Sequence, residues 1–291
     1  MYSDNDKHHC DPKGTFTMTQ VTIDGPCKAP IEVQVQATLK APSDLLTLDR
    51  DKEWLTVNRV DHFTLSGRSV FDGQGVAAWD QNDCKKKSVC NNLPNNLSFN
   101  FLTNSVVRDI TSLDSKLFHV NVLGGKNLTF DHFTIKAPAD SHNTDGIHIA
   151  KIIDVNVKDS VIGTGDDCIS IGDGTENLRI TGVTCGPGHR ISVRSLIGKT
   201  PVKSQLRKPS QVKISKVSYK NIKGTSATEE VVILACSSGV PCEGVEIGEI
   251  NLTFKGGAAK SVCSNVKPTL TGKQVPPLVC VTGGAKSSYL K

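Results

Sequence analysis

Three short polar segments recur at a fixed interval in the middle of the chain, and each directly precedes a short run that is typical of a β-strand. Asp145 lies 22 residues before Asp167, which itself lies 22 residues before His189. If 22 residues make one turn of a β-solenoid, side chains one turn apart stack on neighbouring strands about 4.8 Å apart. The spacing therefore predicts that Asp145, Asp166, Asp167 and His189 share one surface patch.

Short alternating runs of apolar and polar residues repeat along the chain, whereas helical periodicity and tight hairpin dipeptides are scarce. The scarcity of hairpin signals argues against an antiparallel sandwich. Two or three short strands in each turn of variable length are typical of a solenoid. The sequence thus predicts an all-β fold, a parallel β-helix, with one set of strands over 96–99, 127–130, 154–157, 177–180, 211–214 and 244–247, and a second over 117–120, 146–149, 168–171 and 231–234.

No shift in composition divides the chain, so residues 1–291 are expected to form a single β-helix domain. Hydrophobic residues make up 37% of the sequence and aromatic residues only 5%, which suits stacked aliphatic side chains. Residues 1–11 are expected to be a disordered tail. Residues 264–291 are rich in proline and glycine and are expected to be a loop-rich tail, tied back by a Cys263–Cys280 bridge.

Ten cysteines indicate an oxidising compartment, and Cys84–Cys90 and Cys236–Cys242 are spaced to close small loops. The absence of a Cys-x-x-Cys pair argues against a zinc site. Residues 1–9 have neither a basic start nor an apolar core, so the sequence is interpreted as a fragment or as a chain that has lost its first part. Three glycosylation acceptor sequences are consistent with secretion, and they begin at Asn96, Asn127 and Asn251.

The formal net charge is +5 and the sequence pI is about 8.6, so a polyanionic substrate would be attracted to the surface. Nucleic acid is not an expected partner, because the lysine run 85–87 is isolated, lacks an aromatic stacking platform and is interpreted as a solvated loop. No stretch approaches the roughly 20 apolar residues of a membrane span, so no membrane partner is expected.

The predicted patch holds the groups that acid–base hydrolysis of a glycosidic bond requires. One carboxyl group must keep a proton for the leaving oxygen, while an ionised one takes a proton from water. The plainer alternative is that Asn-Thr-Asp-Gly and Gly-Asp-Asp only end strands, as turn sequences do. Equal spacing of the three motifs favours the catalytic interpretation, because stacked like charges repel and need a use or a compensating cation.

The motifs also resemble those of a known family. Asn-Thr-Asp, Gly-Asp-Asp and Gly-His, in this order and spacing, resemble three of the four signature motifs of the polygalacturonases, the pectin-cleaving family 28 glycoside hydrolases. The similarity runs from Pro12 through 71–75 to 224–228 and is greatest to the plant pollen-type branch. It implies a right-handed parallel β-helix, inverting and preferably exo-acting cleavage of α-1,4-linked galacturonic acid, no metal or cofactor, and a secreted cell-wall monomer.

Carried over to this chain, the resemblance implies that Asp166 is the general acid and that Asp145 and Asp167 activate the attacking water. Burial beside two ionised neighbours would raise the pKa of Asp166, and His189 would help to set its protonation.

Two further features flank these acids. The resemblance implies that Asn143 hydrogen-bonds the sugar or orients the carboxylate two residues later, although a turn residue is an equally open interpretation. Cys168 and Cys185 flank one coil and are expected to form a disulfide beside the site.

The third motif departs from the family at Arg190, where a second glycine is expected. The side chain could fill space meant for the sugar, or require a backbone angle that glycine adopts cheaply. Alternatively, the guanidinium could pair with Asp167 and hold it ionised. The sequence leaves these three alternatives open.

A larger departure follows. Family members continue for roughly two further coils that carry an Arg-Ile-Lys motif, which grips the galacturonate carboxylate. Here the chain passes almost directly from Lys199 to Ser210, and Arg-Ile-Lys occurs nowhere. Losing such a clamp commonly costs about 2–5 kcal/mol of binding free energy. The candidate substitutes are Arg194, Lys199, Arg207 and Lys208, and Asn143, Arg190 and Arg194 are the expected substrate contacts.

The sequence is therefore interpreted as a polygalacturonase-type hydrolase with weakened or absent activity. The alternative is a non-catalytic cell-wall β-helix that binds pectin or a protein partner, and a truncated or mis-spliced product is a third possibility.

Overall fold

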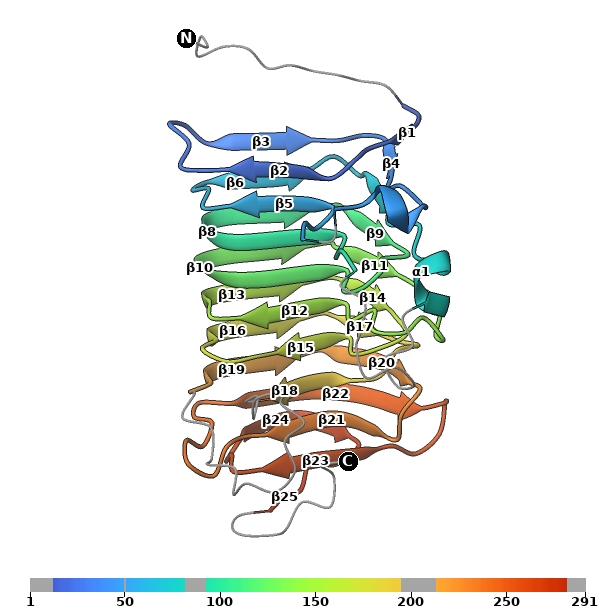
Figure 1. Cartoon of the computed structure of the whole chain (residues 1–291). Coiled ribbons are helices and arrows are strands. Elements are labelled where there is room, and N and C mark those ends of the chain that lie inside the picture. The colour runs from blue at the N-terminus through green and yellow to red at the C-terminus, as the bar shows by residue number, and fades with distance from the viewer. Residues whose placement is uncertain (1–12, 50, 82–92, 195–212, 282–291) are drawn as a thin grey trace, which may run out of the picture.

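The chain folds into a stack of coils, each built from short strands on three faces (Figure 1). The computed structural model describes residues 13–49, 51–81, 93–194 and 213–281. Within these ranges, 25 strands pair in parallel, and the helices are a 3₁₀ turn, η1 (Leu45–Thr47), and a short α-helix, α1 (Val76–Gln81). The predicted right-handed parallel β-helix is thus confirmed, while the predicted tail 1–11, the Cys84–Cys90 bridge and the lysine run lie outside the described residues.

The first face carries the strands that follow the polar motifs. Val120 pairs with Ile147, Ile147 with Ile169, and Ile169 with Ile191, so the predicted 22-residue turns are present. This face contains β2 (Val21–Asp24), β5 (Leu55–Asn58), the first parts of β8 (Leu97–Arg108) and β10 (Val120–Asp131), β12 (Ile147–Ala150), β15 (Ile169–Ile171), β18 (Ile191–Arg194), β21 (Glu230–Ala235), β23 (Lys260–Ser264) and β25 (Cys280–Val281).

The other two faces complete each coil. The second face contains β3 (Ile31–Gln34), β6 (Phe63–Ser66), the second parts of β8 and β10, β13 (Ile153–Lys158), β16 (Glu176–Thr181), β19 (Ser215–Lys220), the start of β22 (Glu246–Phe254) and β24 (Thr269–Val275). The third contains β1 (Thr15–Thr17), β4 (Thr38–Lys40), β7 (Val70–Asp72), β9 (Thr111–Leu113), β11 (Thr134–Lys136), β14 (Val161–Gly163), β17 (Thr184–Cys185), β20 (Ile222–Ser226) and the rest of β22.

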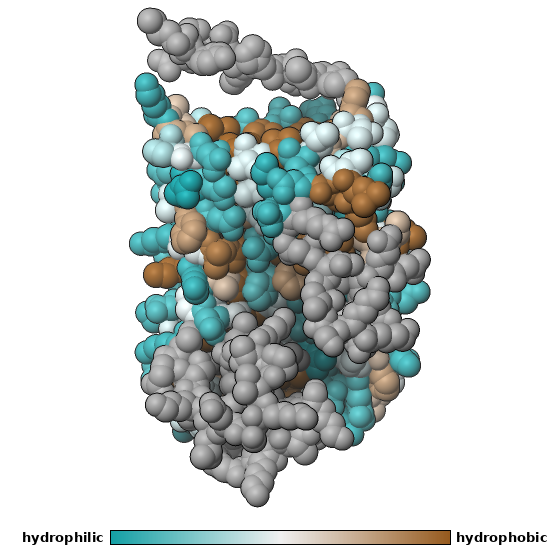
Figure 2. All heavy atoms as spheres, viewed as in Figure 1, coloured by the Kyte–Doolittle hydropathy of each residue, from teal (hydrophilic) through white to brown (hydrophobic). Residues whose placement is uncertain are grey.

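Aliphatic ladders fill the space between the faces, as the composition predicts. Leu128, Val155, Leu178 and Val217 stack in register on the second face, and none of them is exposed. Burial of one such side chain contributes about 1.5–3 kcal/mol. At the N-terminal end of the stack the inward-facing residues of β2 and β3 are only half-buried, and Figure 2 shows hydrophobic atoms at that end.

The corner before the second face explains a recurrent asparagine. Asn104, Asn127 and Asn177 all have left-handed φ angles near +50° to +60°, which asparagine tolerates better than most residues. Asn127 Nδ2 donates to Asn104 Oδ1 at 2.9 Å, so the corner side chains form a ladder. The similar run at 96–99 was predicted for the same set, but it lies on the first face, because Leu97 pairs with Val120.

Other strand boundaries differ by a few residues. The runs predicted at 211–214 and 244–247 belong to β19 and β22, which begin at Ser215 and Glu246; residues 211 and 212 lie outside the described part. Residues 264–281 contain β24 and β25, so this segment is more regular than its prolines indicate. The predicted bridges Cys168–Cys185, Cys236–Cys242 and Cys263–Cys280 are all present. No helix of the described part could cross a membrane.

Candidate active site

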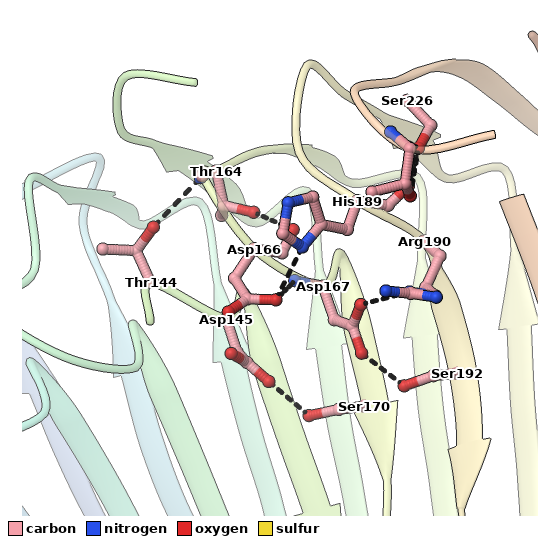
Figure 3. A network of polar contacts seen from close by, with 12 residues as sticks. Thr144, Asp145, Thr164, Asp166, Asp167, Ser170, His189, Arg190, Ser192 and Ser226 are labelled. Atoms are coloured by element: carbon pink, nitrogen blue, oxygen red, sulfur yellow. Dashed lines mark hydrogen bonds and ion pairs between the residues drawn. The ribbon is translucent and has the colours of Figure 1, made fainter. Parts of the chain in front are cut away.

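The three polar motifs meet at the corner that leads into the first face (Figure 3). Asp145 precedes β12, Asp166 and Asp167 precede β15, and His189 precedes β18, so the pairing of these strands stacks the motifs coil upon coil. The turns also hold one another, because the Gly165 amide donates to Thr144 Oγ1 at 3.0 Å. The predicted shared patch is therefore present.

Asp145 is the carboxyl group that retains a proton most readily. Burial raises its pKa well above the ordinary range, and the negative charges of Asp166 and Asp167 raise it further. A hydrogen bond from Ser170 Oγ to Asp145 Oδ2, 2.9 Å long, opposes this shift but does not cancel it. The proton shared by this acidic cluster is thus held on Asp145 in the free protein.

Asp166 has the opposite electrostatic environment, and the prediction that its neighbours raise its pKa is wrong for this structure. Burial does raise the pKa of Asp166, but the His189 side chain, with Nδ1 at 2.8 Å from Oδ1, lowers it by hydrogen bonding and by charge. The Asp167 amide, which donates to the same oxygen at 2.9 Å, and the charge of Arg190 add to that effect. The net result is a lowered pKa, so Asp166 is ionised when the site is empty.

Asp167 is held by two donors. Arg190 Nε donates to Oδ1 at 3.1 Å and Ser192 Oγ donates to Oδ2 at 2.6 Å. The Asp167 side chain is 9% exposed and that of Arg190 is 18% exposed, so the ion pair is largely shielded from water. Of the three alternatives for Arg190, the structure shows the pairing, and Arg190 is not among the residues with a positive φ.

Sequence reasoning missed the serines that support the acids. His148, Ser170 and Ser192 form an outward-facing row on the first face at the same 22-residue interval, so the periodicity contained this signal. His148 Nδ1 lies 2.9 Å from Ser170 Oγ, whose own proton goes to Asp145; Nδ1 is therefore the donor. Each acid thus has its own polar support.

The remaining predicted site residues are less well defined. Asn143 has a left-handed φ of 56° in the turn before Asp145, which fits the turn-residue interpretation, while a contact with the sugar stays a prediction. Arg194 ends β18, but its side chain and residues 195–212 lie outside the described part.

Two groups of residues could hold a cation by geometry. Donor atoms of Asp166, Asp167 and His189 lie within 4.8 Å of one another, but Arg190 already supplies positive charge at this point. The other group, Asp131, His132 and Asp159, is largely exposed, and Lys158 Nζ lies 2.8 Å from Asp131.

The pH dependence of stability offers a test of where the proton lies. Because the folded-state pKa of Asp145 is raised, its contribution to stability is present at low pH and is lost as the pH rises through that pKa. We expect Asp145→Asn to raise the free energy of unfolding at pH 8, by about 1.4 kcal/mol for each unit of the shift, and to change it little below pH 4. Urea melts at both pH values measure this, and an equal effect at both would contradict the assignment.

A parallel β-helix that gathers three carboxylates and a histidine at one corner has the fold and the groups of an enzyme that cleaves glycosidic bonds in polysaccharides. Residues 7–203 and 199–275 match the family described as Glycosyl hydrolases family 28. The chain belongs to this family.

Curated relatives support this assignment. The chain is 50% identical over 339 residues to a polygalacturonase of Nicotiana tabacum, an alignment that covers 95% of this chain and 84% of the relative. It is 44% identical over 340 residues to an exopolygalacturonase of Oenothera organensis, covering 95% and 93%. Such homologues are glycoside hydrolases that act on O-glycosyl bonds, and so is this family member.

Solved structures agree on the fold. A polygalacturonase from Erwinia carotovora superposes with a TM-score of 0.60 at 16% identity, covering 93% of this chain and 96% of that chain. An endo-xylogalacturonan hydrolase from Aspergillus tubingensis gives 0.57 at 17% identity, covering 94% and 91%. At these identities the likeness supports the β-helix alone.

The alignments also bear on the coils that the sequence lacks. The 339 positions aligned with the Nicotiana tabacum protein exceed the 291 residues of this chain, so at least 48 of them (339 − 291) face gaps in it. The family match is split at 199–203, inside the stretch where coils were predicted to be missing. The split of the family match and the sequence analysis thus point to the same stretch.

Proposed function

We propose that this family 28 hydrolase acts on galacturonan by inverting, exo-type cleavage, and that its activity is weaker than that of its relatives. The observation that carries the proposal is the stacking of Asp145, Asp166 and Asp167, with His189 bonded to Asp166. The names of several relatives, including the exopolygalacturonases of Oenothera organensis and Platanus acerifolia, support exo action.

In the proposed mechanism Asp166 donates a proton to the glycosidic oxygen, while Asp145 and Asp167 take the proton of the attacking water. The free site is not yet arranged for this step, because its proton is on Asp145 and Asp166 is ionised. The shared proton must pass to Asp166 when substrate binds. Arg190 and His189 oppose that transfer, since both favour the ionised form of Asp166.

Two features thus support a weakened activity. The first is Arg190, which pairs with the water-activating Asp167 and lowers the pKa of the proposed acid. The second is the lack of an Arg-Ile-Lys segment, whose loss removes a cationic grip on the sugar carboxylate. Asn143, Arg190 and Arg194 are the proposed substrate contacts in its place.

A reducing-sugar assay with polygalacturonate tests the proposal. We expect slow release of single galacturonate units, with the anomeric configuration inverted as read by NMR early in the reaction. Release of mixed oligomers would indicate endo action. No release at any enzyme concentration would favour a non-catalytic β-helix that binds pectin, the second candidate, which the paired state of Asp167 makes worth testing.

Binding of galacturonate oligomers is expected to be weak and sensitive to salt. The net charge of +5 attracts the polyanion, but exposed charges are screened within about 8–10 Å at physiological ionic strength. Calorimetry at 20 and 200 mM salt should therefore show the affinity falling steeply. Tight binding that persists at high salt would mean that Arg190 or Arg194 has replaced the missing grip.

A further inference from the structure

The three glycosylation acceptor sequences differ sharply in the folded chain. Asn96 is 2% exposed, and its Nδ2 atom donates to Ser112 Oγ at 3.0 Å and to the Leu113 carbonyl at 3.1 Å. The sugar of an N-linked glycan is attached to this same nitrogen. A chain modified at Asn96 could not form the observed corner, so the acceptor sequence at this position is incompatible with the fold.

Asn127 is exposed, but its amide nitrogen is engaged. Nδ2 donates to Asn104 Oδ1 at 2.9 Å in the corner ladder, and the residue has a left-handed φ of 59°. A sugar at this position would replace one of the two N–H groups of the ladder amide.

Asn251 is in a different position. It lies in β22 on the outer side of the third face, in register with Lys223 on one side and Val275 on the other, and it is exposed. Its side chain borders a recess of about 410 Å³, within the size range of small-molecule sites. The Thr253 hydroxyl, the other part of the acceptor sequence, makes only a long contact of 3.4 Å to the Gly224 carbonyl.

The lining of the recess suits a neutral acetamido sugar. Ile222, Ile250 and Val275 provide apolar surface for the face and methyl group of such a sugar. Charged and amide groups that can bond its hydroxyls lie around them, namely Lys223, Lys273, Glu249 and Asn221. The occupant and its attachment point therefore lie side by side.

We propose that Asn251 carries an N-linked glycan whose first sugar packs into this recess, and that Asn96 stays unmodified in the folded protein. The inference rests on the proposed secretion of the chain, but not on its activity. Secretion supplies the glycosylating compartment, and glycan occupancy is measured without any substrate.

Two matched variants test the proposal. Each removes only the hydroxyl of an acceptor sequence: Thr253→Ala for the site at Asn251, and Ser98→Ala for the site at Asn96. Ser98 is buried, and its hydroxyl has no partner among the described residues, so the second change is mild. The full chain is secreted from yeast behind a host signal sequence, and glycopeptides are analysed by mass spectrometry.

We expect a glycan on the Asn251 peptide in most molecules, its loss in Thr253→Ala, and an unchanged glycan mass in Ser98→Ala. Folded, secreted protein with a bare Asn251, or with a glycan on Asn96, would overturn the assignment. The recess has its own readout: an endoglycosidase should release the Asn251 glycan at least tenfold more slowly from native than from denatured protein. Equal rates would show that the sugar does not pack there.

Discussion

Replacing Arg190 with methionine is expected to lower the free energy of unfolding by about 3 kcal/mol, because the change leaves the Asp167 carboxylate largely shielded from water without its cation. Methionine retains much of the length and apolar surface of the arginine stem, so the lost charge dominates the effect. Urea melts at pH 7 measure the change.

Two controls isolate the ion pair. Lys213→Met breaks a pair of similar length, 2.8 Å to Glu243, but with side chains 51% and 69% exposed, so it should cost less than 1 kcal/mol. The double variant Arg190→Met with Asp167→Asn should recover most of the loss, since the uncompensated charge is gone. Purely additive effects in this cycle would show that Arg190 stabilises the fold by packing instead.

Arg190 also separates stability from activity. Because its charge lowers the pKa of Asp166, its removal favours the protonated acid, and turnover per folded molecule should not fall further. Arg190→Gly alone is nevertheless not expected to restore the activity of the relatives, since the cationic grip is still missing.

The stacking of the site could be predicted because its coils are equal in length. Between β12 and β18 each coil has 22 residues, so counting along the sequence gives the register. Elsewhere the coils vary: Leu55 pairs with Leu97, 42 residues later, and Ile191 with Val232, 41 residues later. Counting fails there, because loops of any length can join strands of the same stack.

The protonation of the site could not be predicted, because it depends on which donors touch which oxygen. The sequence shows that three carboxylates are close, but not that His189 contacts Asp166 while Asp145 has only hydroxyl support. The same limit applies to Asn96 and Asn127, which begin nearly identical strings. One amide is buried at the corner before the first face, and the other forms part of an exposed ladder.

Replacing Asp166 with asparagine is expected to remove nearly all hydrolysis of polygalacturonate. An amide cannot deliver a proton to the leaving oxygen, and loss of one acid–base group typically costs about 10²–10⁴-fold in rate. The same change also removes one of the charges that raise the pKa of Asp145, so Asp145 should titrate at lower pH in this variant. The rate comes from the reducing-sugar assay, and the Asp145 titration from NMR of the labelled carboxyl group.

Asp159→Asn is the matched control, because it makes the same chemical change at an exposed corner residue away from the acidic cluster. Asp159 has a left-handed φ of 48°, which asparagine also tolerates, so fold and rate should both be kept. If Asp166→Asn turned over substrate as fast as Asp159→Asn, Asp166 would not be the acid. Asp145, which holds the proton in the free site, would then be the group to test next, since its protonated carboxyl lies one coil away on the same corner.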